Sequence, residues 1–193
     1  FSKTSATVAI RKAMAISFVA YNNLGKISNV VLGDTSSTFA ATVSIDNSVY
    51  VGMVAYDNKN EISNVVNNYK IKITNTISGG IYVGGIVVNN YKKLVCCGNN
   101  NSIEIDSARI NLGGIATYNN DTSAVIEECF NNGNISINTT YKNANSINIT
   151  VGGILGTLRA GTMAYCYMIG ELKLTNSTSK TNAEVKFAGL IGY

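Results

Sequence analysis

The sequence predicts an all-β fold: a right-handed parallel β-solenoid of about five three-sided coils, with residues 1–193 as one repeat domain. Three recurring segments predict it: a glycine-containing apolar phrase, a pair of apolar residues three positions apart, and a stretch in which apolar and polar residues alternate. β-Branched residues, Asn and Gly dominate the chain. No long stretch carries a 3.6-residue apolar period, so helices are disfavoured.

The glycine phrase is the clearest repeat, and its copies lie 29 to 39 residues apart. Loop insertions between the copies explain the uneven spacing, because a solenoid tolerates them on its surface. The copies occupy residues 51–54, 83–86, 112–115, 151–154 and 188–191, with a degenerate first copy at 16–19.

An Asn-rich pair follows most copies of the phrase. Asn accepts left-handed backbone angles and can bond to the main chain, which suits it to a sharp corner. We therefore expect a turn of the coil at residues 22–23, 57–58, 89–90 and 119–120.

The apolar pairs come next and predict two ladders with one rung per coil. They are Ile27 with Val30, Ile62 with Val65, Leu94 with Cys97, Ile126 with Cys129, and Met163 with Cys166.

The alternating segment predicts a strand with one buried face. Its inward residues are Phe39/Ala41, Ile71/Ile73, Ile103/Ile105, Ile135/Ile137 and Leu172/Leu174. If coils stack at the inter-strand spacing of about 4.8 Å, equivalent residues lie on one another. The outward residues then place Lys72 beside Glu104, and Thr74 beside Asp106 and then Asn138.

The amino-acid composition argues against several classes of function. The chain has 46% hydrophobic residues, a net charge of +4 and no His, Pro or Trp. The scattered lysines argue against a nucleic-acid partner, and the missing His removes the commonest general base and metal ligand. The longest apolar runs reach about half of the roughly 20 residues that cross a bilayer, so we expect no membrane insertion. The sequence indicates no cofactor and no metal site.

Residues 153–156 and 189–192, taken with residues 126–135, resemble the GLUG motif, an apolar glycine phrase followed by a coil of the form I-x-N-C-x-N-x-G-x-I. The resemblance covers nearly the whole chain, although Val30 and Val65 stand where the motif has Cys. Proteins of this family are surface proteins of bacteria and protists, including adhesins. The resemblance implies an extracellular or cell-surface β-helical stalk or passenger, with no catalytic residues to carry over.

Both ends of the sequence cut through a repeat. Bare coil ends would expose unpaired strand edges. We therefore expect either a segment of a longer repeat protein or ends that a neighbouring chain or cap covers. The expected partners are neighbouring repeats or identical subunits bound end to end.

The four cysteines invite a metal or redox interpretation, but their spacing without His matches no zinc pattern. Cys97, Cys129 and Cys166 are predicted to form a structural ladder of small apolar rungs, while Cys96 points outward. A disulfide between neighbouring rungs stays geometrically open, because the coil spacing falls within the Cα range of such bonds.

The acidic residues Glu104 with Asp106, and Glu127 with Glu128, are candidate catalytic carboxylates of a polysaccharide-cleaving enzyme. Their predicted neighbours on adjacent coils, such as Lys72 and Ser136, are not acidic, so we favour a non-catalytic role.

Two further sets of residues are candidate contact or modification sites. Tyr21, Tyr56 and Tyr193 fall in one corner slot of the repeat and form a candidate carbohydrate-contacting strip, because aromatic faces and amides are common in sugar recognition. Glycosylation sequons begin at Asn100, Asn120, Asn134, Asn138, Asn148 and Asn176, and are relevant only in a eukaryotic secretory setting.

Three hypotheses of function follow. The first is a non-catalytic structural or adhesive segment, a stalk, fibre or adhesin passenger that contacts cell-surface glycans or host surface proteins. The second is a self-assembling extracellular filament, and the third a carbohydrate-active β-helix enzyme.

Overall fold

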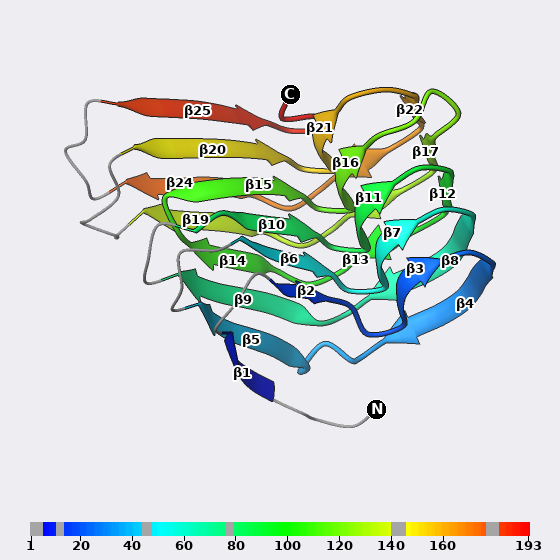
Figure 1. The fold of residues 1–193 in the computed structure, drawn as a ribbon, viewed down its shortest axis with the longest axis horizontal. Helices are drawn as coiled ribbons and strands as arrows, with labels where there is room; N and C mark the ends of the chain where they lie inside the picture. The colour runs from blue at the N-terminus through cyan, green and yellow to red at the C-terminus, as the bar shows by residue number, and fades with distance from the viewer. Residues whose placement is uncertain (1–5, 11–13, 44–47, 76–78, 140–145, 177–181) are drawn as a thin grey trace.

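The computed structural model describes residues 6–10, 14–43, 48–75, 79–139, 146–176 and 182–193. In these residues the chain forms β-strands and no helix, and all paired strands are parallel. Figure 1 shows the coils stacked from β1 at the bottom to β25 at the top. The predicted β-solenoid is therefore confirmed. None of the described segments forms a helix that could cross a membrane.

Four sheets run along the stack, and each coil passes through them in turn. Sheet A consists of β1 (Ala6–Ile10), β5 (Thr38–Val43), β9 (Lys70–Asn75), β14 (Ile103–Asp106), β19 (Ile135–Thr139) and β24 (Leu172–Asn176). Sheet B consists of β2 (Met14–Ile16), β6 (Val49–Gly52), β10 (Ile81–Gly84), β15 (Arg109–Gly113), β20 (Ile147–Gly152) and β25 (Ala183–Ala188).

The other two sheets complete each coil. Sheet C consists of β3 (Ala20–Asn23), β7 (Ala55–Asn58), β11 (Val87–Asn90), β16 (Ala116–Asn119) and β21 (Leu155–Leu158). Sheet D consists of β4 (Lys26–Leu32), β8 (Glu61–Asn67), β12 (Lys93–Val95), β13 (Gly98–Asn99), β17 (Val125–Glu127), β18 (Phe130–Asn131), β22 (Thr162–Ala164) and β23 (Tyr167–Met168).

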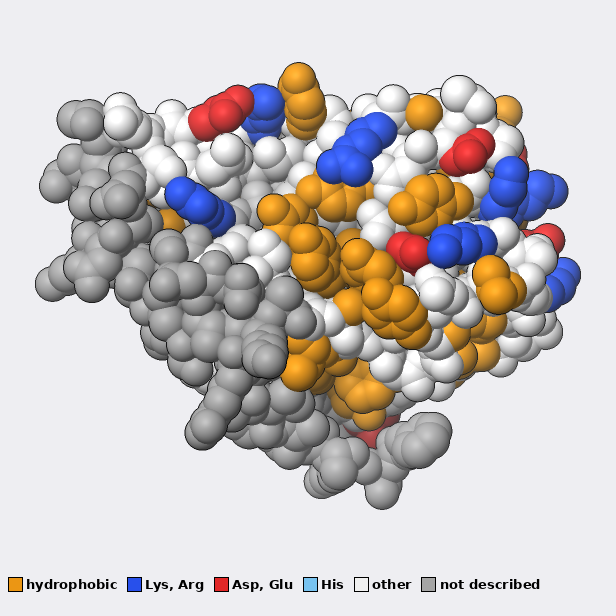
Figure 2. All heavy atoms as spheres, viewed as in Figure 1, with side chains coloured by type: hydrophobic (Ala, Val, Ile, Leu, Met, Phe, Trp, Pro, Cys, Tyr) orange, Lys and Arg blue, Asp and Glu red, His pale blue; other side chains and the backbone are white. Residues whose placement is uncertain are grey.

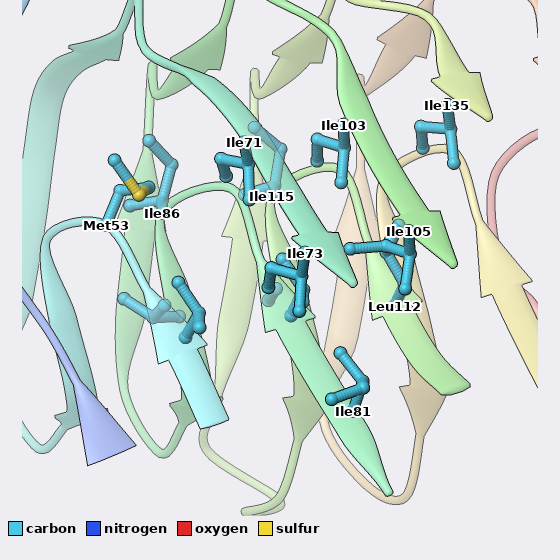
Figure 3. Packing of buried hydrophobic residues seen from close by; sticks show 14 of the residues in the cluster. Met53, Ile71, Ile73, Ile81, Ile86, Ile103, Ile105, Leu112, Ile115 and Ile135 are labelled. Atoms are coloured by element: carbon cyan, nitrogen blue, oxygen red, sulfur yellow. The ribbon is translucent and has the colours of Figure 1, made fainter. Parts of the chain in front are cut away.

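The register of sheet A is the one that the alternating segment predicted. Ile103 pairs with Ile71 on one side and with Ile135 on the other. Figure 3 shows these three side chains in one row, and all three are fully buried. Burial of each such rung contributes about 1.5 to 3 kcal/mol. On the outer face, Glu104 lies between Lys72 and Ser136, again as expected.

The glycine phrase forms a corner between sheets B and C rather than a single side. A coil therefore has four sheets, where the sequence repeat indicated three sides. The corner is tight because the chain folds back on its own backbone. A Cβ atom on Gly84 would overlap the carbonyl oxygen of Val87, and one on Gly113 would overlap that of Ala116. Only glycine fits at such a close approach of two backbones.

The last copy of the phrase is shifted by one residue from the alignment that the sequence suggested. Val151 pairs with Phe187, not with Ala188. The amides of Ile154 and Leu155 both donate to the carbonyl oxygen of Leu190, so Leu190 takes the place of the predicted Ile191. Hydrogen bonding to the preceding coil sets this register, which the pattern of apolar residues alone does not determine.

A second corner divides sheet D, and its residues adopt left-handed backbone angles. They are Asn29, Asn64, Cys96, Glu128 and Tyr165, with φ between 52° and 57°. The Asn-rich pairs after the glycine phrase, where the sequence predicted a turn, do not use such angles. Those pairs end the strands of sheet C with φ outside this region, and side-chain hydrogen bonds satisfy their corner instead.

Two buried asparagine ladders line the inside of the corners. In the first, the side-chain amide of Asn58 donates to Asn90 Oδ1 at 2.8 Å and to the carbonyl oxygen of Lys93 at 2.9 Å. In the second, Asn67 donates to Asn99, which donates in turn to Asn131, both at 2.8 Å. The amides of Asn58, Asn67 and Asn99 each bond to the equivalent asparagine of the next coil and to the turning backbone, which satisfies these buried groups. Asn131 Nδ2, at the end of the second ladder, has no partner in the described part of the protein.

The second ladder supplies a test of burial. Asn99→Ala removes three side-chain bonds inside the protein and should lower the free energy of unfolding by about 2 kcal/mol, because water cannot replace them. Asn100→Ala is the matched control, since Asn100 makes two amide bonds of 3.0 Å in an exposed ladder. Its effect should stay within about 0.5 kcal/mol. Urea unfolding followed by circular dichroism measures both, and equal losses would contradict the ladder's role.

The left-handed corner of sheet D supplies a second test, of backbone conformation. Tyr165 has φ of 53° and an 80% exposed side chain. Tyr165→Asn should raise the free energy of unfolding by about 1 kcal/mol, because Asn tolerates this backbone region better than Tyr. Tyr167→Asn should lower it, because Tyr167 stacks on Phe130 with centroids 5.8 Å apart. Thermal melting distinguishes the two, and a similar loss in both variants would refute the explanation.

Candidate functional site

Aromatic side chains gather on the outer face where sheets B and C meet. Figure 2 shows hydrophobic side chains as a band across this face, over the strands of the middle coils. The band contains a connected group of tyrosines, which we call the tyrosine strip: Tyr21, Tyr50, Tyr56, Tyr82 and Tyr118.

The strip forms because equivalent outward residues stack from coil to coil. Tyr50 pairs in register with Tyr82, and their rings stack at 4.7 Å with a 16° interplanar angle. Tyr21 and Tyr56 stack in the same way at 5.0 Å. Tyr50 also meets Tyr56 edge to face at 5.6 Å, which joins the column on sheet B to that on sheet C. Such aromatic pairs contribute about 0.5–1.5 kcal/mol each beyond area burial.

A hollow of about 380 Å³ opens where the stacked column on sheet B stops. The residues that follow Tyr82 in this column are Asn111 and Thr150, which are too small to continue the stack. The hollow is lined by Tyr82, Arg109, Ile110, Asn111, Tyr118, Ser146, Asn148 and Thr150. Except for Ile110 and the two tyrosines, these side chains are polar.

One arginine lines this hollow, and a second contacts one of its lining tyrosines. Arg109 lines it, and the bond described for its guanidinium is a long one of 3.5 Å to Ser146 Oγ. Arg159 lies over the ring of Tyr118, 3.9 Å from the centroid, and donates to Asn120 Oδ1 at 3.1 Å. Burial raises the pKa of Tyr118 to about 12, so its hydroxyl stays protonated at neutral pH.

The structure brings together two of the three tyrosines that the sequence placed in one slot. Tyr21 and Tyr56 are stacked, as expected. The placement of Tyr193 with them was wrong: Leu155 pairs with Ile191, so Tyr193 continues the column of Tyr118 and Thr157. The error follows from the one-residue shift in the last glycine phrase. Tyr193 instead lies under Lys186, whose Nζ is 3.4 Å from the ring centroid.

Sequence reasoning missed Tyr50 and Tyr82, which form the centre of the strip. They lie one residue before Val51 and Val83 of the glycine phrase, and the repeat alignment already placed them one coil apart. What the alignment did not show is that sheets B and C meet at a corner that brings their outward columns into contact.

The cysteine ladder is present as predicted. Cys97 and Cys129 are fully buried, Cys166 is half-buried, and all four thiols are free. The Sγ atoms donate to backbone carbonyls, for example Cys129 to Glu127 at 3.3 Å. Hydrogen bonds to Cys166 and Cys97 raise the pKa of Cys129, and burial acts in the same direction. These thiols are therefore packed rungs in this structure.

Cys96 points away from that ladder, as expected, and meets a carboxylate. Its Sγ donates to Glu128 Oε2 at 2.9 Å. This bond, with smaller contributions from burial and from the charge of Glu128, raises the pKa of Cys96 to about 11.

The other candidate carboxylates are distributed along the stack. Glu104 forms an ion pair of 2.6 Å with Lys70, and Asp106 lies in register with Thr74 and Asn138. Within the described ranges, His, Cys, Asp and Glu form no group of three that could hold a metal ion.

Five of the six sequon asparagines have described side chains. Asn134, Asn138 and Asn148 are exposed on the outer face. Asn100 and Asn120 use their amides as donors to Asn68 and Asn89 of the preceding coil, so a glycan there would displace a ladder bond. The side chain of Asn176 lies outside the described part.

The Cys96–Glu128 contact predicts slow alkylation. At pH 9, about a hundredth of the Cys96 thiol should be thiolate, which is the reactive form. Glu128→Gln removes the charge, lowers the pKa and should speed labelling by iodoacetamide at least about fivefold. Glu127→Gln is the control and should change the rate little. Mass spectrometry of the labelled peptide measures both, and equal rates in Glu128→Gln and the unmodified protein would contradict the contact.

Comparison of the chain with family models, with curated proteins and with solved structures gives no significant match. The geometry above therefore stands on its own, and the GLUG resemblance stays a hypothesis. What is established is the architecture: the chain is a parallel β-solenoid with a tyrosine strip beside a polar hollow.

Proposed function

We propose that the chain is a non-catalytic structural and adhesive segment of an extracellular or cell-surface protein, a stalk, fibre or adhesin passenger. One observation carries the proposal: the same register repeats in all four sheets, so each coil is hydrogen-bonded to the next on every side. Such stacking makes a stiff body whose side faces repeat along its length. The GLUG resemblance supports the same role.

The buried ladders support stiffness. Rows of isoleucine and asparagine run through successive coils, and their bonds cross from coil to coil. Bending between two coils would break several of these contacts at once. A protein that must hold a binding face at a distance from a surface needs this property.

The proposal predicts where the segment lies on cells. An antibody raised against residues 1–193 should label intact, unpermeabilised cells of the source organism. Labelling that needs permeabilisation would overturn the extracellular location.

Stiffness is tested separately by hydrogen exchange: the amide of Ile103, which donates to the carbonyl oxygen of Asn134 at 2.8 Å, should be among the slowest to exchange. Exchange as fast as in exposed turns would contradict a stiff stack.

End-to-end self-assembly is the second candidate, favoured by apolar side chains exposed on the outermost described coils. On the first coil, Phe18 and Leu24 are 47% and 73% exposed, and on the last Ile169 and Leu190 are 74% and 42% exposed. Sedimentation at rising concentration tests it. Association should weaken in Leu24→Lys and in Ile169→Lys, and a chain that stays monomeric at all concentrations would exclude it.

A further inference from the structure

The hollow beside Tyr82 is a gap in a regular stack. Tyr50 covers one face of the Tyr82 ring, so the opposite face is turned toward the next coil. There the column continues with Asn111, whose side chain leans toward sheet C and donates to Thr157 Oγ1 at 2.9 Å. A third stacked ring is therefore missing from this column, and the hollow lies there beside Tyr118, whose ring is tilted by 33° at 6.2 Å from that of Tyr82.

The size and lining of the gap fit a hydrated ring. Its volume of about 380 Å³ lies at the lower end of the range for small-molecule sites, about 300–1,000 Å³. A sugar ring presents C–H groups on its faces and hydroxyls on its rim. Tyr82 offers a flat aromatic surface for the first, and Asn148, Thr150 and Ser146 offer hydrogen-bonding groups for the second.

Asn111 borders the hollow, and its amide is held by the bond to Thr157. Its Oδ1 atom is buried beside Gly156 and has no hydrogen-bond partner in the described part of the protein, as is also true of Thr117 Oγ1 and Asn131 Nδ2. This buried oxygen therefore adds no contact for a ligand.

The charge at the hollow favours an anion. Arg109 is the charged residue of the lining, and no carboxylate is among the described lining residues. Glu184, in the same column two coils away, is already paired with Lys186 at 2.9 Å. A guanidinium binds a carboxylate through two parallel hydrogen bonds, so Arg109 is suited to pair with a planar carboxylate group.

We propose that this hollow binds a carboxylated sugar residue of an acidic polysaccharide. The sugar ring packs on the aromatic wall that Tyr82 and Tyr118 give the hollow, the carboxylate pairs with Arg109, and hydroxyls bond to Asn148, Thr150 and Ser146. The tyrosine strip extends away from the hollow along the lower coils and gives the remaining chain of the polysaccharide an aromatic surface. This inference rests on the proposed adhesive role and names its ligand class.

Calorimetric titration of the unglycosylated protein tests the site. The probes are three carboxylated saccharides, tetragalacturonate, a hyaluronan tetrasaccharide and 3′-sialyllactose, with the methyl ester of tetragalacturonate as the uncharged match. At least one acid should bind, and the ester of a galacturonate ligand should bind about tenfold more weakly. Binding of none of the three acids, or equal binding of tetragalacturonate and its ester, overturns the proposal.

Variants locate the binding. Arg109→Gln should weaken it about tenfold and Tyr82→Leu at least about threefold. Asn148→Trp should block it, because Asn148 is exposed and its side chain lines the hollow. Lys173→Gln and Tyr167→Leu are matched controls on sheets A and D, outside the hollow, and should bind as the unmodified protein does.

Two results would exclude this site even if an acid binds. One is an equal loss of affinity in the control variants, which would show that binding depends on the overall charge of the protein or that the variants do not fold. The other is equal binding of a short poly-glutamate peptide, which would show carboxylate binding without sugar recognition. Circular dichroism and melting of each variant check the stack independently. A stiff, surface-exposed segment that binds no saccharide would refute this inference and leave the proposed scaffold role intact.

Discussion

The structure depends on one constraint: each inward side chain must lie on its equivalent in the next coil, about 4.8 Å away. Backbone hydrogen bonds between coils fix that distance, so neighbouring rungs have to match in size and polarity. Isoleucine on isoleucine satisfies the constraint by burial of apolar surface, as in Ile71, Ile103 and Ile135. Asparagine satisfies it differently, because one amide can donate to the next without interruption.

The corners show how the chain meets this constraint while it turns. Between sheets B and C the backbone approaches itself so closely that glycine is required at Gly84 and Gly113. Within sheet D the turn needs left-handed angles, which Asn29 and Asn64 adopt at low cost. Glu128 and Tyr165 adopt the same angles at higher cost. Stacking thus fixes the backbone angle at this corner, whereas the type of residue there varies from coil to coil.

The outward residues are under no such constraint, since water can replace any partner that they lack. Their columns change from aromatic to polar within a few coils, as from Tyr82 to Asn111 and Thr150. This change creates the hollow. A regular stack interrupted on its outer face produces a shaped site without altering the core, which makes a repeat architecture suitable for presenting ligand-binding surfaces.

The sequence by itself determined the strand content, the stacking of the coils, the rows of buried isoleucine and the cysteine ladder, because inward positions repeat visibly. It could not place the tyrosine strip or the hollow, which need residues from different columns, such as Tyr82 and Tyr118, to meet across the corner of sheets B and C. It also misplaced Tyr193 and did not identify the left-handed positions in sheet D. Hydrogen bonding to the previous coil decides register and backbone angle, and only the folded stack supplies that partner.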